Sequence, residues 1–374
     1  RQMCIRDRYT YRNKNCIMLN RKELKNKAIE LLKDLIEIES FSGEENKTAD
    51  RIVEFLEQSG AKAERINNNV YSFHSPYDPT KKTILLNSHH DTVKPGQSWT
   101  YNPFEAKIEG DRLTGLGSND AGASAVSLLA TFIYFLDKEI PFNLIVAITA
   151  EEENSGNLNV GSLLPSLPKI DLGIVGEPTK MDMAIAERGL IVYDIEVKGK
   201  TGHAARNEGI NAIYLANDLL NRLQNFCFDK VSEFMGPVKL TVTQIEAGKQ
   251  HNVVPDSCKL VMDVRVNELY SNEEVNARLQ KEFSSDSISF IPRSLRLNSS
   301  KIDPTHPIVQ KGISLGCATY GSPTLSDQSM MDFTTVKIGP GDSARSHTPD
   351  EFIYLSEIEH GIDRYIALLE DFNF

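Results

Sequence analysis

The chain carries acidic and imidazole side chains in short stretches that lie at or just after the ends of predicted strands. Such strand ends are where open α/β sheets place their ligands. Imidazole and carboxylate groups arriving together there form a hard-ligand set suited to two divalent ions, with zinc favoured by the mixed character. The stretches are "NSHHDTV" (87–93), "GLGSNDAG" (115–122), "TAEEENSG" (149–156) and "GEPT" (176–179), and "GPGDSARSHTPDE" (339–351) adds an imidazole in a glycine-rich loop.

Taken singly, these stretches also have structural explanations. His89 and Asp91 could form a hydrogen-bonded turn, Asp120 could cap the following helix, and the glutamates of 151–153 could face solvent. Carboxylates about 4 Å apart repel by roughly 4 kcal/mol at an effective dielectric of about 20. Either water or a cation must therefore compensate three adjacent glutamates. Because the acidic and imidazole stretches occur together in one chain, we predict that a cation compensates the glutamates.

The elements that must position these groups follow from hydrophobic periodicity. Apolar residues at helical spacing predict amphipathic helices, and short apolar runs between them predict buried strands. This alternation is typical of an α/β sheet with helices packed on it. The predicted helices are 21–38, 48–60 and 121–136, and the predicted strands are 83–88, 143–149 and a strand end at 172–178.

The pattern changes after about residue 185, where strands and helices follow in the order β-α-β-β-α-β of the ferredoxin-like unit. We therefore predict an α/β catalytic domain, residues 19–184 and 293–374, with an inserted ferredoxin-like α+β lid (dimerisation) domain, residues 185–292. Residues 1–18 lack the apolar block of a signal peptide and are predicted to be a non-native or disordered extension, with the natural start at Met18. The predicted lid strands are 189–199, 238–248, 257–268 and 287–292, and its helices are 210–226 and 272–283.

Composition restricts the partners. With 374 residues, a net charge of -11 and a pI near 5.3, the chain is a poor match for nucleic acid or an anionic membrane, so a small-molecule substrate is expected. Its five cysteines form no CxxC pair, which favours a reducing, cytoplasmic location. No apolar stretch approaches the roughly 20 residues of a membrane span. The sequence contains no complete nucleotide-binding glycine loop and no complete serine-hydrolase motif.

The order H-x-D, N-D, acidic-E-E, G-E-P-T and a late histidine resembles the zinc-dependent acetylornithine deacetylase, succinyl-diaminopimelate desuccinylase, aminoacylase and carboxypeptidase G family, from about residue 20 onwards. The resemblance implies two divalent metal ions, zinc first, with cobalt or manganese as alternatives. It also implies that His89 and Glu177 bind one metal, that His347 binds the other, and that Asp120 bridges them. Asp91 would orient His89.

The same resemblance assigns the adjacent glutamates. Glu152 would be the general base and Glu153 a ligand of the metal bound by His347, while His90 would not be a ligand. A shift of one residue, to Glu151 and Glu152, stays open because the following glycine stands one place later than in many relatives.

The lid would supply a second set of residues. The resemblance implies that His203 stabilises the oxyanion, that Asn252 and Arg265 receive the substrate, and that Arg345 is a further substrate contact. A histidine in a glycine-rich turn and an arginine in a strand also occur for purely structural reasons.

The implied function is a two-metal amidohydrolase that removes an acetyl or succinyl group from an N-acyl ornithine, citrulline or diaminopimelate, in arginine or lysine biosynthesis. The alternatives are a metallo-exopeptidase or dipeptidase with the same site, and a metal-free binding protein, which would need a missing ligand. We also expect a homodimer formed through the lid, because the lid has an exposed edge strand. His203 is expected to act in the neighbouring subunit's site, because it lies in the lid whereas all predicted metal ligands lie in the other domain.

Overall fold

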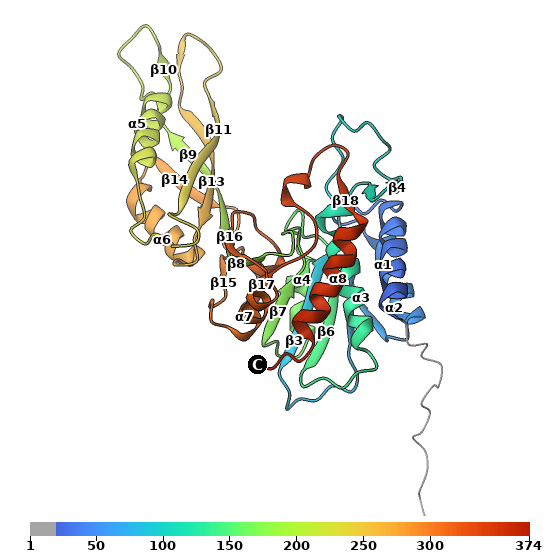
Figure 1. Ribbon diagram of the computed structural model, residues 1–374. Coiled ribbons are helices and arrows are strands. Elements are labelled where there is room, and N and C mark those ends of the chain that lie inside the picture. The colour runs from blue at the N-terminus through green and yellow to red at the C-terminus, as the bar shows by residue number, and fades with distance from the viewer. Residues whose placement is uncertain (1–19) are drawn as a thin grey trace, which may run out of the picture.

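A computed structural model describes residues 20–374. The extension predicted at residues 1–18 lies outside the described residues. The larger part of the molecule is built on a nine-stranded sheet of order β1-β2-β6-β3-β7-β17-β8-β15, with β16 paired to β8 (Figure 1). Strands β6, β3, β7 and β17 run parallel to one another, so their carboxyl ends lie at one edge. The strands are β1 Ala63–Ile66, β2 Asn69–Phe73, β3 Thr83–His89, β6 Asn143–Thr149, β7 Leu172–Val175, β8 Met183–Glu187, β15 Ser300–Lys301, β16 Thr319–Ser322 and β17 Thr335–Lys337.

Helices cover both faces of this sheet. On one face a large apolar core joins the sheet to five helices, and α3 is apolar on all sides because it packs against the sheet, α1 and α8. On the other face a smaller core lies under α4 (Val160–Leu163). The first face carries α1 Arg21–Ile36, α2 Asn46–Gln58, α3 Ala123–Phe135, α7 Pro307–Ser314 and α8 Leu355–Leu369.

The lid is a separate four-stranded antiparallel sheet of order β11-β13-β9-β14, with its own apolar core beneath two helices (Figure 1). The two central strands, β9 and β13, bury alternate residues, as expected for a sheet covered on one face. The predicted fold class, including the inserted β-α-β-β-α-β unit, is confirmed. The lid elements are β9 Gly189–Lys198, α5 Ala212–Asn225, β11 Lys239–Ala247, β13 Ser257–Val266, α6 Asn272–Phe283 and β14 Ile288–Pro292, with a small ladder of β10 Gly202–His203 and β12 Val253–Val254.

The chain crosses between the two sheets at one short connection. Strand β8 ends at Glu187 and β9 begins at Gly189, so Arg188 alone separates them. The Arg188 guanidinium donates to the main-chain oxygens of Met235 and Pro237, the latter at 2.9 Å. The return segment, 293–299, runs beside this crossing, where the Leu190 N–H donates to the Leu297 oxygen.

A three-stranded sheet, β18-β5-β4, lies beside the main sheet and brings the C-terminal part of the chain next to residues 112–122. Its strands are β4 Lys107–Glu109, β5 Arg112–Thr114 and β18 Phe352–Tyr354. Within residues 20–374, no helix has the length and apolar character required to cross a membrane.

Candidate metal centre

Neighbouring strands bring the predicted ligands together. His89 is the last residue of β3, Glu153 follows β6, and Glu177 follows β7; these three strands are adjacent and parallel. Asp120 lies in an irregular turn, η1 (Ser118–Gly122), just before α3, and His347 follows β17 in the glycine-rich loop. The parallel strand ends thus converge on one site at the carboxyl edge of the sheet.

Asp120 stands between two groups of donors. Its Oδ1 lies 3.3 Å from His89 Nε2, which in turn is 3.7 Å from Glu177 Oε1. Its Oδ2 lies 3.6 Å from His347 Nε2, which is 2.9 Å from Glu153 Oε2. Ligand atoms of His89, Asp120 and Glu153 all lie within 4.8 Å of one another. Imidazole and carboxylate donors at these separations fit a pair of divalent ions sharing one carboxylate.

Two structural explanations offered for these residues are wrong. The first residue of α3 is Ala123, its N-cap is Gly122, and no side chain caps it, so Asp120 is not a helix cap. Asp120 instead has an extended backbone, with φ -115° and ψ 100°. The Glu153 side chain is only 8% exposed, so this glutamate does not belong to a solvated loop.

Burial and crowding of carboxylates dominate the electrostatics. Burial raises the pKa of Glu177 to about 8 and the pKa of Glu152 well above its usual value, and the neighbouring carboxylates add to both shifts. The hydrogen bond to Glu153 raises the pKa of His347 to about 9. Burial opposes protonation of His89, but Asp120 and Asp91 raise its pKa nevertheless. A site with these shifts favours cations, since a cation stabilises the charged carboxylates.

Asp91 holds the glutamate segment in place. Its fully buried carboxylate accepts hydrogen bonds from the backbone N–H groups of Glu152 and Glu153, each at 3.1 Å, and from the Ser42 hydroxyl at 2.7 Å. Asp91 Oδ1 also lies 3.4 Å from His89 Nδ1. One carboxylate therefore orients both the histidine and the two glutamates assigned as base and ligand.

His90 points away from this cluster. Its Nδ1 lies 2.8 Å from the Thr48 hydroxyl and its Nε2 lies 2.9 Å from the Asn68 carbonyl oxygen. Burial lowers its pKa to about 4, so the ring is neutral. Both ring nitrogens are occupied by structural partners, as expected for a residue outside the ligand set.

The four predicted substrate-contacting residues are not gathered at the cluster. His203, on β10, and Asn252, just before β12, lie at the end of the lid remote from the main sheet (Figure 1). Arg265 lies near the crossing, where its guanidinium donates to both oxygens of Asp263 at 2.8 and 3.0 Å. Arg345 donates to Glu357 of α8 at 2.6 and 3.2 Å.

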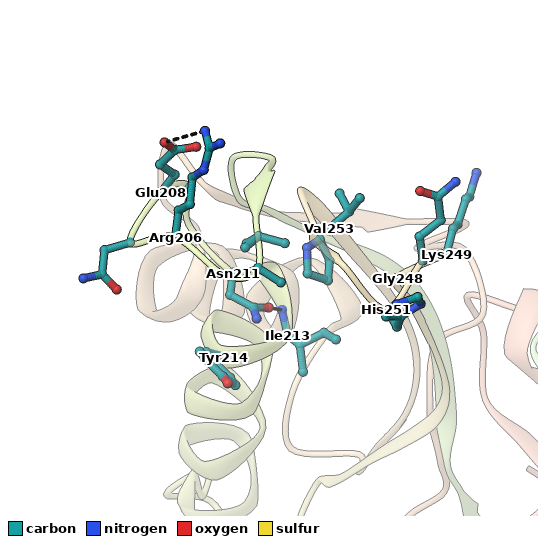
Figure 2. A pocket seen from close by; sticks show the side chains of 15 residues that line it. Arg206, Glu208, Asn211, Ile213, Tyr214, Gly248, Lys249, His251 and Val253 are labelled. Carbon is teal, nitrogen blue, oxygen red and sulfur yellow. Dashed lines mark hydrogen bonds and ion pairs between the residues drawn. The ribbon is translucent and has the colours of Figure 1, made fainter.

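A pocket of about 650 Å³ opens at the same remote end of the lid, between the start of α5 and the loop 248–255 (Figure 2). Ile213, Tyr214 and Val253 line it and are exposed over 41%, 72% and 39% of their surfaces. Lys249 and His251 extend from the opposite side.

Sequence reasoning missed three acidic residues near the centre. Asp327 is buried and accepts the Thr149 hydroxyl at 2.6 Å, and burial raises its pKa to about 6. Glu187 forms a buried ion pair with Lys337 at 2.9 Å. Glu351 is the last residue of the "GPGDSARSHTPDE" loop, and the sequence predicted no role for it. The first two carry no local signal because their partners are far away in sequence.

Comparison with known proteins identifies the family. A family model described as a peptidase dimerisation domain matches residues 185–289. A succinyl-diaminopimelate desuccinylase of Orientia tsutsugamushi (strain Boryong) is 31% identical over 269 residues, spanning 66% of this chain and 69% of that protein. A Schizosaccharomyces pombe protein described as a peptidase M20 domain-containing protein is 27% identical over 352 residues, or 90% of this chain and 82% of that protein. The chain belongs to the M20 family.

Solved M20 structures share the whole fold. Aminopeptidase PepT of Bacillus cereus covers 94% of this chain and 99% of its own, with a TM-score of 0.74 and 18% identity. A dinuclear metal binding peptidase of the M20 family from Bacillus subtilis covers 94% and 100%, with a TM-score of 0.71 and 16% identity. The resemblance predicted from the motif order is confirmed, and the M20 chain is a metal-dependent hydrolase of amide bonds.

Proposed function

We propose that this protein is a two-metal amidohydrolase that removes an acetyl or succinyl group from an N-acyl amino acid. The observation that carries the proposal is the position of Asp120, whose two oxygens face His89 and His347 separately. The similarity to succinyl-diaminopimelate desuccinylases supports the substrate class. Within that class we propose a derivative of ornithine, citrulline or diaminopimelate, in arginine or lysine biosynthesis.

The proposed ligand sets follow the distances. His89, Glu177 and Asp120 hold one ion, and Asp120, Glu153 and His347 hold the other. Zinc suits this mixture best, and cobalt or manganese could replace it. When bound, the two ions polarise the amide carbonyl and activate the attacking water.

Glu152 is the proposed base. Its backbone N–H is fixed by Asp91, while its side chain is not one of the groups that contact either histidine. The raised pKa of Glu152, caused first by burial, suits a carboxylate that accepts a proton and gives it back. Glu152 takes a proton from the attacking water and then delivers it to the departing amine.

The lid, residues 185–292, is proposed to supply substrate contacts to the catalytic domain, residues 19–184 and 293–374. Arg265 receives a substrate carboxylate through its planar fork once Asp263 releases it. Arg345, held by Glu357, is a further substrate contact only if that pair opens. His203 stabilises the oxyanion and Asn252 binds substrate, both from a neighbouring copy.

Two features support a homodimer through the lid. The match to a dimerisation domain covers the lid, and β11 is an edge strand with mostly exposed residues that a second copy could pair. The position of His203 and Asn252, at the end of the lid remote from the main sheet, supports their action in the partner's site (Figure 1). The pocket beside them in Figure 2 would then lie in the interface.

The substrate class is tested with metal-reconstituted enzyme and a panel of N-acetyl and N-succinyl amino acids together with dipeptides, scored by release of amine. We expect release from N-acyl ornithine, citrulline or diaminopimelate. Release only from dipeptides would instead establish the alternative, a metallo-exopeptidase or dipeptidase. The panel must include dipeptides because the fold is similar to that of aminopeptidase PepT.

The partner contribution is tested by co-expressing His203→Ala with Glu152→Gln. If His203 acts across the interface, one site in each mixed dimer combines an intact Glu152 with an intact His203, and activity returns to a sizeable fraction. If His203 acts within its own chain, every site keeps one defect. Absence of rescue in verified mixed dimers would eliminate the trans arrangement.

A further inference from the structure

The carboxylate of Glu351 is buried against the turn that carries Asp120. Only 2% of Glu351 is exposed. Its Oε1 accepts the backbone N–H groups of Asn119 at 2.8 Å and Asp120 at 2.9 Å, and its Oε2 accepts the N–H of Gly117 at 3.1 Å. Its own carbonyl oxygen accepts the Gly115 N–H at 3.0 Å. Glu351 therefore accepts hydrogen bonds from four main-chain N–H groups of residues 115–120, three through its side chain and one through its carbonyl oxygen.

Regular secondary structure does not fix this turn. Gly117 has a φ of 73°, and neither Asp120 nor Ala121 has helical backbone angles. Among the hydrogen bonds of the described residues, the N–H groups of Gly117, Asn119 and Asp120 have Glu351 as their acceptor. Buried N–H groups need acceptors, so loss of the Glu351 carboxyl group would leave the N–H groups of Gly117, Asn119 and Asp120 without their acceptor.

Glu351 also belongs to the segment that carries His347. Glu351 stands four positions after His347, and β18 begins directly after Glu351. A second tie joins the same two segments, because the buried Asn119 side chain donates to the Asp342 oxygen at 3.1 Å and accepts the Asp342 N–H at 3.0 Å. The turn bearing the proposed bridging ligand and the loop bearing a ligand of the second ion are thus joined as one unit.

We propose that Glu351 is a positioning residue that sets the direction of the Asp120 carboxylate and its separation from His347, and thereby the affinity for the pair of ions. The inference rests on the proposed function, since it assumes that Asp120 bridges two ions. Glu351 is not a hydrogen-bond partner of His89 or His347 among the described residues, and it acts through the backbone N–H of Asp120.

Glu351→Gln is the most direct variant, because it preserves size while placing an NH₂ group against at least one of the three N–H donors. We expect the affinity for zinc, measured by competition with a chelator, to fall about 10- to 100-fold, the usual loss when a group that orients ligands is removed. The visible absorption of the cobalt-substituted protein should change, because it reports the ligand geometry. At saturating metal, kcat should fall more than KM rises.

Asp350→Asn is the matched control. Asp350 is adjacent, has a φ of 54° that asparagine tolerates, and binds the Thr100 N–H and hydroxyl at 2.9 and 2.6 Å, away from η1. Its zinc affinity and cobalt spectrum should match wild type. A Glu351→Gln protein that binds two ions with wild-type affinity and an unchanged spectrum would overturn the inference. A wild-type protein that binds no divalent ion would instead overturn the metal site itself.

A third measurement covers the case in which Glu351→Gln does not fold. Amide hydrogen exchange of the metal-free wild-type protein should show protection at Gly117, Asn119 and Asp120, because each donates to Glu351. If those three amides exchange as fast as amides in an exposed loop, the proposal that Glu351 holds the turn is wrong.

Discussion

Binding of two zinc ions to the metal-free protein should release at least two protons per chain at pH 7, because the ligand His89, whose pKa is raised well above its usual value, adds to the protons of Glu177 and His347. Both Glu177, with a pKa of about 8, and His347, with a pKa of about 9, hold a proton at that pH, at roughly 90% and 99% occupancy. Each must lose it to coordinate a cation. At pH 9, Glu177 contributes about one tenth of a proton and His347 about one half. The apparent affinity for zinc should therefore rise between pH 7 and pH 9.

The count is measured by titration calorimetry in buffers that differ in ionisation enthalpy, since the slope of heat against that enthalpy gives the protons released. The matched control is His306→Asn, which removes a histidine that is not a predicted ligand and keeps a residue able to cap α7. This variant should release the same number of protons as wild type. Near-zero release at pH 7, or the same release at pH 7 and pH 9, would refute the reasoning.

Two further variants test the substrate fork and the buried ion pair. Arg265→Lys cannot reproduce the planar fork, so kcat/KM should fall about 10-fold or more; unchanged kcat/KM in steady-state assays would remove Arg265 from the site. Lys337→Met leaves Glu187 buried without its cation, and urea unfolding should show a loss of about 3–5 kcal/mol, whereas the double variant Lys337→Met, Glu187→Leu should lose much less. Equal losses in the single and double variants would contradict that account.

The sequence was most informative where one element provides its own pattern. Helix α1 was predictable because Leu24, Ala28 and Leu31 repeat on one buried face, and β3 and β6 because each contains a short, fully buried apolar run. Strands β4, β5 and β18 have three residues each, too few to show a period. The start of α3 could not be read from the apolar run, because the bonds to Glu351 that shape η1 come from over 200 residues away.

Some residues of the candidate site could likewise be predicted from the sequence, and others could not. His89, Asp120, Glu153, Glu177 and His347 each stand beside a strand end or a glycine-rich loop, so motif order alone brought them together. Asp327 and the Lys337–Glu187 pair are defined by partners on other strands, and no local pattern marks them. The site proposed for His203 belongs to a second copy of the chain, and a single sequence points to such a copy only through the exposed edge strand of the lid.

The assignment of the three adjacent glutamates is the central claim, and metal content measured together with turnover in Glu152→Gln tests it most directly. This variant should keep close to two ions per chain while losing several orders of magnitude in turnover, because the ligands remain and the base is gone. Glu153→Ala, measured beside it, should lose one ion. A dead, metal-replete Glu151→Gln together with an active Glu152→Gln would contradict the assignment and shift the base by one residue.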